Sequence, residues 1–161
     1  MQPLHIFLVQ VTFTFVLMGL AARWWAWPRL RALPVSDALA IVLFGGAIRY
    51  MGTLMLHPAL SPSADPDVLG AYVDVAVATL ALAGIVANRA ASPLGRPLAW
   101  LYCVLGGFDM LVVFVNGLRA GTWEHLTGGW TFVVTAFPAV GVTLVLTVIL
   151  LARRSAQPAV A

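Results

Sequence analysis

Charged residues are scarce in this chain of 161 residues, where they make up 9% of the sequence against 61% for hydrophobic residues. A soluble domain is typically about 25% charged, because its surface has to face water. The composition therefore excludes an ordinary soluble domain. It predicts a protein whose surroundings are mainly lipid.

Lysine is absent, so all nine basic residues are arginines. Without lysine the chain cannot form a retinal or pyridoxal Schiff base, carry biotin or lipoate, or supply the lysine of a P-loop. Cysteine occurs once, as Cys103, which excludes an intrachain disulfide and a cysteine-only metal cage. Arginine without lysine is also typical of GC-rich bacterial genomes, and together with the short connections it indicates a bacterial inner membrane.

Long apolar runs are abundant. A membrane-spanning helix needs about 20 residues, and the runs of suitable length are residues 4–22, 35–57, 67–88, 97–118 and 130–151. The connections between them are short and carry proline or glycine, which end helices. We predict an all-α integral membrane bundle of five transmembrane helices, forming a single domain over residues 1–154 and followed by a flexible tail over 155–161.

Arginines are distributed unequally between the two sides of such a bundle. If the spans alternate in direction, one side carries only Arg119, whereas the other carries Arg23, Arg29, Arg31, Arg89, Arg96, Arg153 and Arg154. Connections rich in arginine stay on the cytoplasmic side. The sequence therefore predicts that the N-terminus lies outside and the C-terminus inside.

The first connection also contains Trp24, Trp25 and Trp27, next to its arginines. Indole rings and guanidinium groups commonly gather at the depth of the lipid headgroups, so we interpret this segment as an interfacial belt. A site for a partner or for a specific lipid is the alternative. In either case the net charge of +3 is explained by the membrane surface, and no nucleic-acid partner is expected.

Arg49, Asp74 and Asp109 lie inside the predicted spans. Each such charge costs about 3 kcal/mol to insert, so these residues are expected to face the bundle interior and to pair. At about 1.5 Å of helix rise per residue, each lies about 10–13 Å from the outer end of its span. Because three helices bring charges to the same depth, we predict that Arg49 lies between the two carboxylates.

Small and polar residues share the helix faces of these charges, and small residues let helices approach closely in lipid. Gln10, Tyr50 and Asn116 are predicted as further members of the buried polar cluster. Two interpretations stay open: an ion pair that fixes helix order, or a working site that carries a proton or binds a cation. The residues at helical spacing from the charges are Gly45, Gly46, Gly52 and Thr53 around Arg49, Ala78, Ala81, Gly84 and Asn88 after Asp74, and Tyr102 and Gly106 before Asp109.

All three histidines are predicted on the outer side, His5 and His57 at span ends and His125 in a connection, with Glu124 beside it. Neutral imidazole is a common ligand of Zn, Cu and haem iron, so these residues are a candidate metal site if the connections bring them together. No local spacing typical of a metal motif supports it. The alternative is interfacial histidine without a ligand.

Three functions are compatible with these patterns. The favoured prediction is a non-catalytic accessory, assembly or binding subunit of a larger membrane complex, because the chain is small and has short connections. The alternative is a small proton- or ion-coupled transporter or pore acting through the buried carboxylates, which would require an oligomer because five spans are few. A membrane enzyme acting on lipid or quinone, with the carboxylates as acid and base, is the third. The expected partners are the lipid bilayer and other membrane subunits or further copies of the chain.

Overall fold

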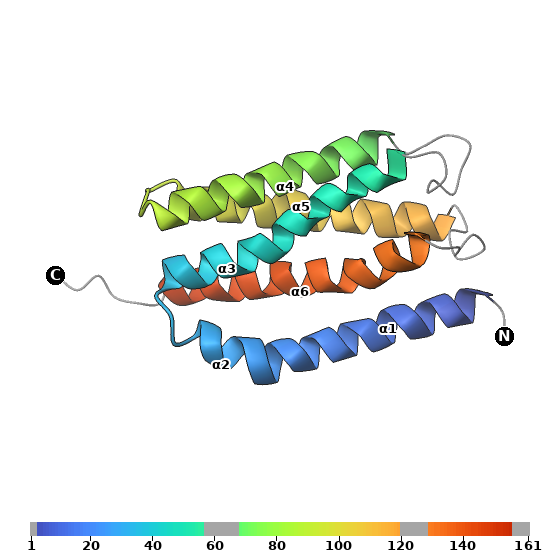
Figure 1. Cartoon of the computed structure of the whole chain (residues 1–161), viewed down its shortest axis with the longest axis horizontal. Coiled ribbons are helices and arrows are strands. Elements are labelled where there is room, and N and C mark those ends of the chain that lie inside the picture. The colour runs from blue at the N-terminus through green and yellow to red at the C-terminus, as the bar shows by residue number, and fades with distance from the viewer. Residues whose placement is uncertain (1–2, 57–67, 120–128, 156–161) are drawn as a thin grey trace.

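The computed structural model describes residues 3–56, 68–119 and 129–155, which are helical apart from short turns (Figure 1). Within these ranges there is no strand, so the predicted all-α class is confirmed. In chain order the elements are α1 (Pro3–Ala21), the π-helix η1 (Ala22–Ala26), α2 (Trp27–Leu30), α3 (Val35–Ala47), the 3₁₀ helix η2 (Ile48–Leu56), α4 (Val68–Arg89), α5 (Gly95–Arg119) and α6 (Gly129–Ser155).

Several of these helices are long and apolar enough to cross a membrane. Among the described residues, the stretches that meet both conditions are His5–Leu30, Val35–Thr53, Val68–Arg89 and Gly95–Asn116. Phe137–Arg153, within α6, is a shorter apolar helix. Each of these stretches overlaps one of the apolar runs predicted from the sequence. Long apolar helices of this kind are consistent with a membrane protein.

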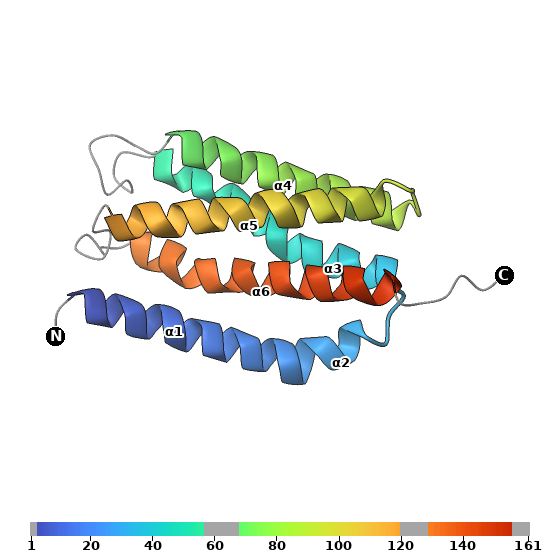
Figure 2. The same cartoon turned by 180° about the vertical axis from the view of Figure 1, so that it is seen from behind.

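The long helices lie side by side, and consecutive ones run in alternating directions (Figures 1 and 2). α4 packs against α3, η2 and α5, and α6 packs against α3 and α5, so α3 to α6 together form a bundle. α1 lies outside this bundle and packs mainly on α6. The buried interior therefore lies within the bundle of α3 to α6. α1 is a peripheral helix that packs on α6, and we call it the α1 arm.

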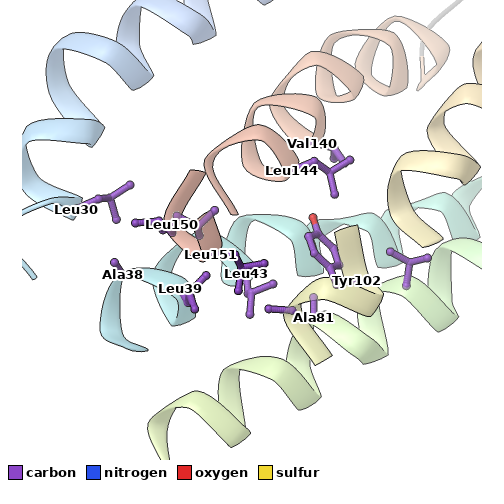
Figure 3. Packing of buried hydrophobic residues seen from close by; sticks show 13 residues of the cluster. Leu30, Ala38, Leu39, Leu43, Ala81, Tyr102, Val140, Leu144, Leu150 and Leu151 are labelled. Atoms are coloured by element: carbon purple, nitrogen blue, oxygen red, sulfur yellow. The ribbon is translucent and has the colours of Figure 1, made fainter. Parts of the chain in front are cut away.

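The core lies between α3, α4, α5 and α6, where large side chains from separate helices meet (Figure 3). Leu39, Leu43, Tyr102 and Leu151 are 0% exposed. The opposite helix faces carry large apolar side chains too, among them Phe108, which is 67% exposed. Apolar side chains on both faces suit helices that are surrounded by lipid rather than by water.

Two departures from the α-helix were not predicted. Pro28 has no N–H to donate to the helix that precedes it, and the chain widens there into η1, where the Trp27 N–H donates to the Ala22 carbonyl. The second departure is η2, which replaces the end of the second predicted span.

The 3₁₀ geometry of η2 changes which residues share a face. In an α-helix, Arg49 and Thr53 would lie together, but a 3₁₀ helix has about 3 residues per turn and places Arg49 above Gly52. Accordingly Gly52 is buried and Thr53 is exposed. The expectation that Thr53 lies on the buried face is wrong for this reason.

Candidate functional site

The structure brings Arg49, Asp74 and Asp109 together inside the bundle. Arg49 is the second residue of η2, and its side chain is 5% exposed. Its Nε donates to Oδ1 of Asp74 at 2.8 Å, and its Nη2 lies 2.8 Å from the same oxygen. Nη2 also pairs with Oδ2 of Asp109. One guanidinium thus joins η2 to both α4 and α5.

The third partner of this guanidinium is a backbone group. Nη1 of Arg49 donates to the Gly106 carbonyl at 3.0 Å, one helical turn before Asp109 on α5. Every nitrogen of the guanidinium therefore has an acceptor within the chain. We call Arg49, Asp74, Asp109 and the Gly106 carbonyl the charge cluster.

Two glycines make room for the charge cluster. A Cβ at Gly52 would lie 2.7 Å from the carboxyl carbon of Asp74, closer than side chains approach one another. A Cβ at Gly106 would lie 3.2 Å from Val77 and 3.4 Å from Nη1 of Arg49. The missing side chains thus let Asp74 reach Arg49 from α4 and let the guanidinium reach the backbone of α5.

The charges in the cluster are unequal in number and well shielded. Asp109 is as buried as Arg49, with its side chain 5% exposed, and that of Asp74 is 16% exposed. One guanidinium faces two carboxylates, which gives a formal charge of −1 if both are ionised. Removing the guanidinium, or both carboxylates, would leave the opposite charge in a medium that solvates charge poorly.

A second polar contact crosses the same core, from α5 to α6. Tyr102 is 0% exposed, and its hydroxyl lies 3.2 Å from that of Thr143. Thr143 uses its single hydroxyl hydrogen on the Val140 carbonyl at 2.7 Å, so Tyr102 is the donor between the two side chains. Figure 3 shows the ring directed toward α6.

Gly46 of α3 makes room for that ring, because a Cβ there would lie 2.9 Å from Cε2 of Tyr102. Thr143 was not predicted from the sequence as a polar contact of the core. The available signal was Tyr102 itself, since a buried tyrosine hydroxyl normally has a hydrogen-bond partner.

The other predicted members of the polar cluster lie elsewhere. Tyr50 is 62% exposed, because one residue of a 3₁₀ helix turns about 120° away from Arg49. Asn116 is exposed, so the face that it shares with Asp109 does not stay buried over the last turns of α5. Gln10 is half-buried on the α1 arm, which packs on α6 rather than on the helices of the charge cluster.

The candidate metal ligands do not come together within the described residues. His5 is exposed on α1, and His57, Glu124 and His125 lie outside the described ranges. Among the described residues no group of three or more histidine, cysteine, aspartate or glutamate side chains is placed to hold a metal ion. The metal hypothesis therefore stays a prediction.

The fold and the charge cluster define a helical protein with several membrane-span candidates and a buried arginine–aspartate ion pair. The chain belongs to the family described as Domain of unknown function (DUF8737), whose model matches residues 6–153. The match extends from α1 to α6 and includes all members of the charge cluster. No curated protein and no solved structure matches the chain.

Proposed function

We propose that this protein is a five-span membrane protein that serves as a non-catalytic accessory or assembly subunit of a larger membrane complex. The observation that carries the proposal is the set of hydrogen bonds and ion pairs that Arg49 makes within its own chain. All its guanidinium nitrogens bond to Asp74, Asp109 and the Gly106 carbonyl of the same chain. A guanidinium used in this way fixes the order and register of its own helices, which suits a rigid structural subunit.

The proposal includes an orientation, with the N-terminus outside and the C-terminus inside a bacterial inner membrane. Contacts between the arginine-rich segments support it. The Arg153 guanidinium carbon lies 5.4 Å from the Trp27 ring centre, and Arg89 Nη1 pairs with Asp37 at 2.7 Å. These contacts gather three arginine-bearing segments at one end of the bundle, and the positive-inside rule assigns such an end to the cytoplasm.

The α1 arm supports the assembly role. Over an 18-residue apolar window of His5–Leu30, 11% of the residues are buried within the chain, against 44% over the corresponding window of Val35–Thr53. Large side chains therefore face outward along α1, including Phe13, which is 67% exposed. An arm with so little intrachain contact has most of its apolar surface available to lipid or to a neighbouring membrane subunit.

Purification of the full chain from its native membrane in mild detergent, followed by native mass spectrometry, tests this function. We expect the chain to be recovered with further subunits at a fixed stoichiometry. Asp109→Asn should lower the yield of the complex, because it removes the charge of the carboxylate through which α5 pairs with Arg49 of η2. Asp37→Asn, which changes an exposed aspartate, is the matched control and should leave the yield unchanged. Recovery of the chain alone, in any mild detergent, would contradict the proposal.

A proton- or ion-coupled pathway is the second candidate, and the excess of carboxylates in the charge cluster favours it. With two aspartates for one arginine, one carboxyl can take up a proton or face a cation while the other keeps the ion pair. Flux into proteoliposomes separates this candidate from the first. Asp74→Asn and Asp109→Asn should abolish flux with the fold retained, Asp37→Asn should not, and wild-type protein without flux would rule the pathway out.

A further inference from the structure

The segment that joins the α1 arm to the bundle forms an elbow, residues 22–31, with two different sides. On the inner side, Leu30 is 5% exposed and belongs to the core cluster, with Trp27 packed against that cluster. On the outer side, Trp24 is 71% exposed and Trp25 is 66% exposed. The elbow is therefore anchored to the bundle while two indole rings face away from it.

A guanidinium group lies against one of these two rings. The Arg29 guanidinium carbon lies 4.4 Å from the centre of the Trp25 ring, and its Nη1 donates to the Trp25 carbonyl at 2.7 Å. This double contact holds Arg29 in place beside the indole and leaves other N–H groups of the guanidinium for a ligand. Arg23 and Arg31 are exposed on the same ten-residue segment.

A further arginine comes from the other end of the chain. Arg153, near the end of α6, lies over the Trp27 ring. The elbow segment itself contains no acidic residue, and Asp37, the next acid along the chain, pairs with Arg89. The elbow and the end of α6 together thus present a positive surface with exposed indole rings.

We propose that this surface binds the headgroup of an anionic phospholipid. Arginine matches the geometry of a phosphate by donating two parallel hydrogen bonds, and indole rings settle at the depth where headgroup meets acyl chain. A free phosphate would use the arginines alone, whereas a phospholipid also uses Trp24 and Trp25 and the apolar surface of α1. The inference rests on the membrane placement proposed above, but not on the accessory role.

Native mass spectrometry of the full chain in neutral detergent tests the site, with equal amounts of phosphatidylglycerol and phosphatidylcholine added. We expect selective retention of phosphatidylglycerol. Each arginine near a headgroup strengthens anionic-lipid binding about fivefold, so the double variant Arg23→Gln/Arg29→Gln should weaken it by roughly 25-fold. Arg119→Gln, at the opposite end of the bundle, is the control and should bind like wild type.

Equal retention of the two lipids, or equal weakening in the Arg119→Gln control, would overturn the site. Displacement of phosphatidylglycerol by millimolar inorganic phosphate would also overturn it, because the arginines would then recognise the anion without the lipid. Failure here would leave the co-purification experiment unaffected, so the two proposals fail separately.

Fluorescence quenching provides a second measurement that does not depend on the arginine variants. Phosphatidylglycerol with brominated acyl chains should quench tryptophan fluorescence more strongly than brominated phosphatidylcholine. The variant Trp24→Phe/Trp25→Phe keeps the core-packed Trp27 and should lose that difference. If the full difference persists in the variant, the lipid does not lie against Trp24 and Trp25, and its assignment to the outer side of the elbow is wrong.

Discussion

Within residues 3–56, 68–119 and 129–155, arginine–aspartate pairs occur at two places, and their surroundings differ. Arg49 and Asp109 meet inside the bundle with both side chains 5% exposed, whereas Arg89 and Asp37 meet at one end with 66% and 38% exposed. Water competes for the exposed pair and salt screens it, so it contributes little to stability. The buried pair has no such competitor, and the cost of leaving either partner alone is correspondingly high.

The largest effect is expected when the buried pair loses its cation. Arg49→Gln leaves two carboxylates in the interior without a guanidinium, and breaking a buried pair in this way costs about 3–5 kcal/mol. We expect the variant to unfold at a much lower SDS fraction than wild type, as measured by circular dichroism in mixed micelles. Arg89→Gln serves as the control. If both variants unfolded at the same SDS fraction, the buried and exposed pairs would not differ in their contribution to stability.

The glycines beside the charge cluster sharpen the comparison at the level of packing. Gly52→Ala places a Cβ against the Asp74 carboxyl, and overpacking of this kind typically costs about 1–3 kcal/mol. Gly107→Ala is the matched control, because nothing lies within 4 Å of a Cβ built there. The same SDS titration should separate the two variants, and a neutral Gly52→Ala would mean that Asp74 does not need this space.

A smaller effect is expected at the neutral polar contact of the core. Tyr102→Phe removes the donor to Thr143 but leaves the threonine bonded to Val140, so the loss should be about 1 kcal/mol. Tyr72→Phe, at a residue that is 65% exposed, should change stability less. Thermal melts in detergent measure both variants. If Tyr72→Phe lowered the melting temperature more than Tyr102→Phe, the Tyr102 hydroxyl would not contribute to stability.

The smallest effect is expected at the exposed pair. Arg89→Gln should lower stability by about 1 kcal/mol or less, and added salt should shrink the difference from wild type. Melting curves of both proteins at low and high ionic strength measure this directly. A large, salt-independent loss would mean that the Arg89–Asp37 contact behaves like a buried pair.

Much of the helical framework follows from patterns that the membrane environment makes strong. A run of about 20 apolar residues has few alternatives to a helix in lipid. The bounds observed for α4 and α5 accordingly lie within two residues of the predicted 67–88 and 97–118 at every end. Charges at matched depths predicted the meeting of Arg49, Asp74 and Asp109. The face of α4 could be predicted as well, because Ala78, Ala81 and Gly84 follow α-helical spacing.

The details that escaped prediction depend on local geometry or on backbone atoms. The 3₁₀ geometry of η2 has no clear periodic signature, so Thr53 was assigned to a face that this geometry turns outward. The Gly106 carbonyl carries no side-chain pattern at all, although it is one of the three partners of Arg49. The weak packing of the α1 arm also depends on contacts between distant helices, which no single apolar run encodes.

The η2 helix also alters the reach of the segment to which it belongs. A 3₁₀ helix rises about 2.0 Å per residue against about 1.5 Å in an α-helix, so its nine residues cover about 18 Å instead of about 14 Å. Together with the 13 residues of α3, the segment is about 38 Å long. It can therefore cross a hydrocarbon layer of about 30 Å even when strongly tilted. A thicker bilayer would consequently be matched by a smaller tilt of this segment.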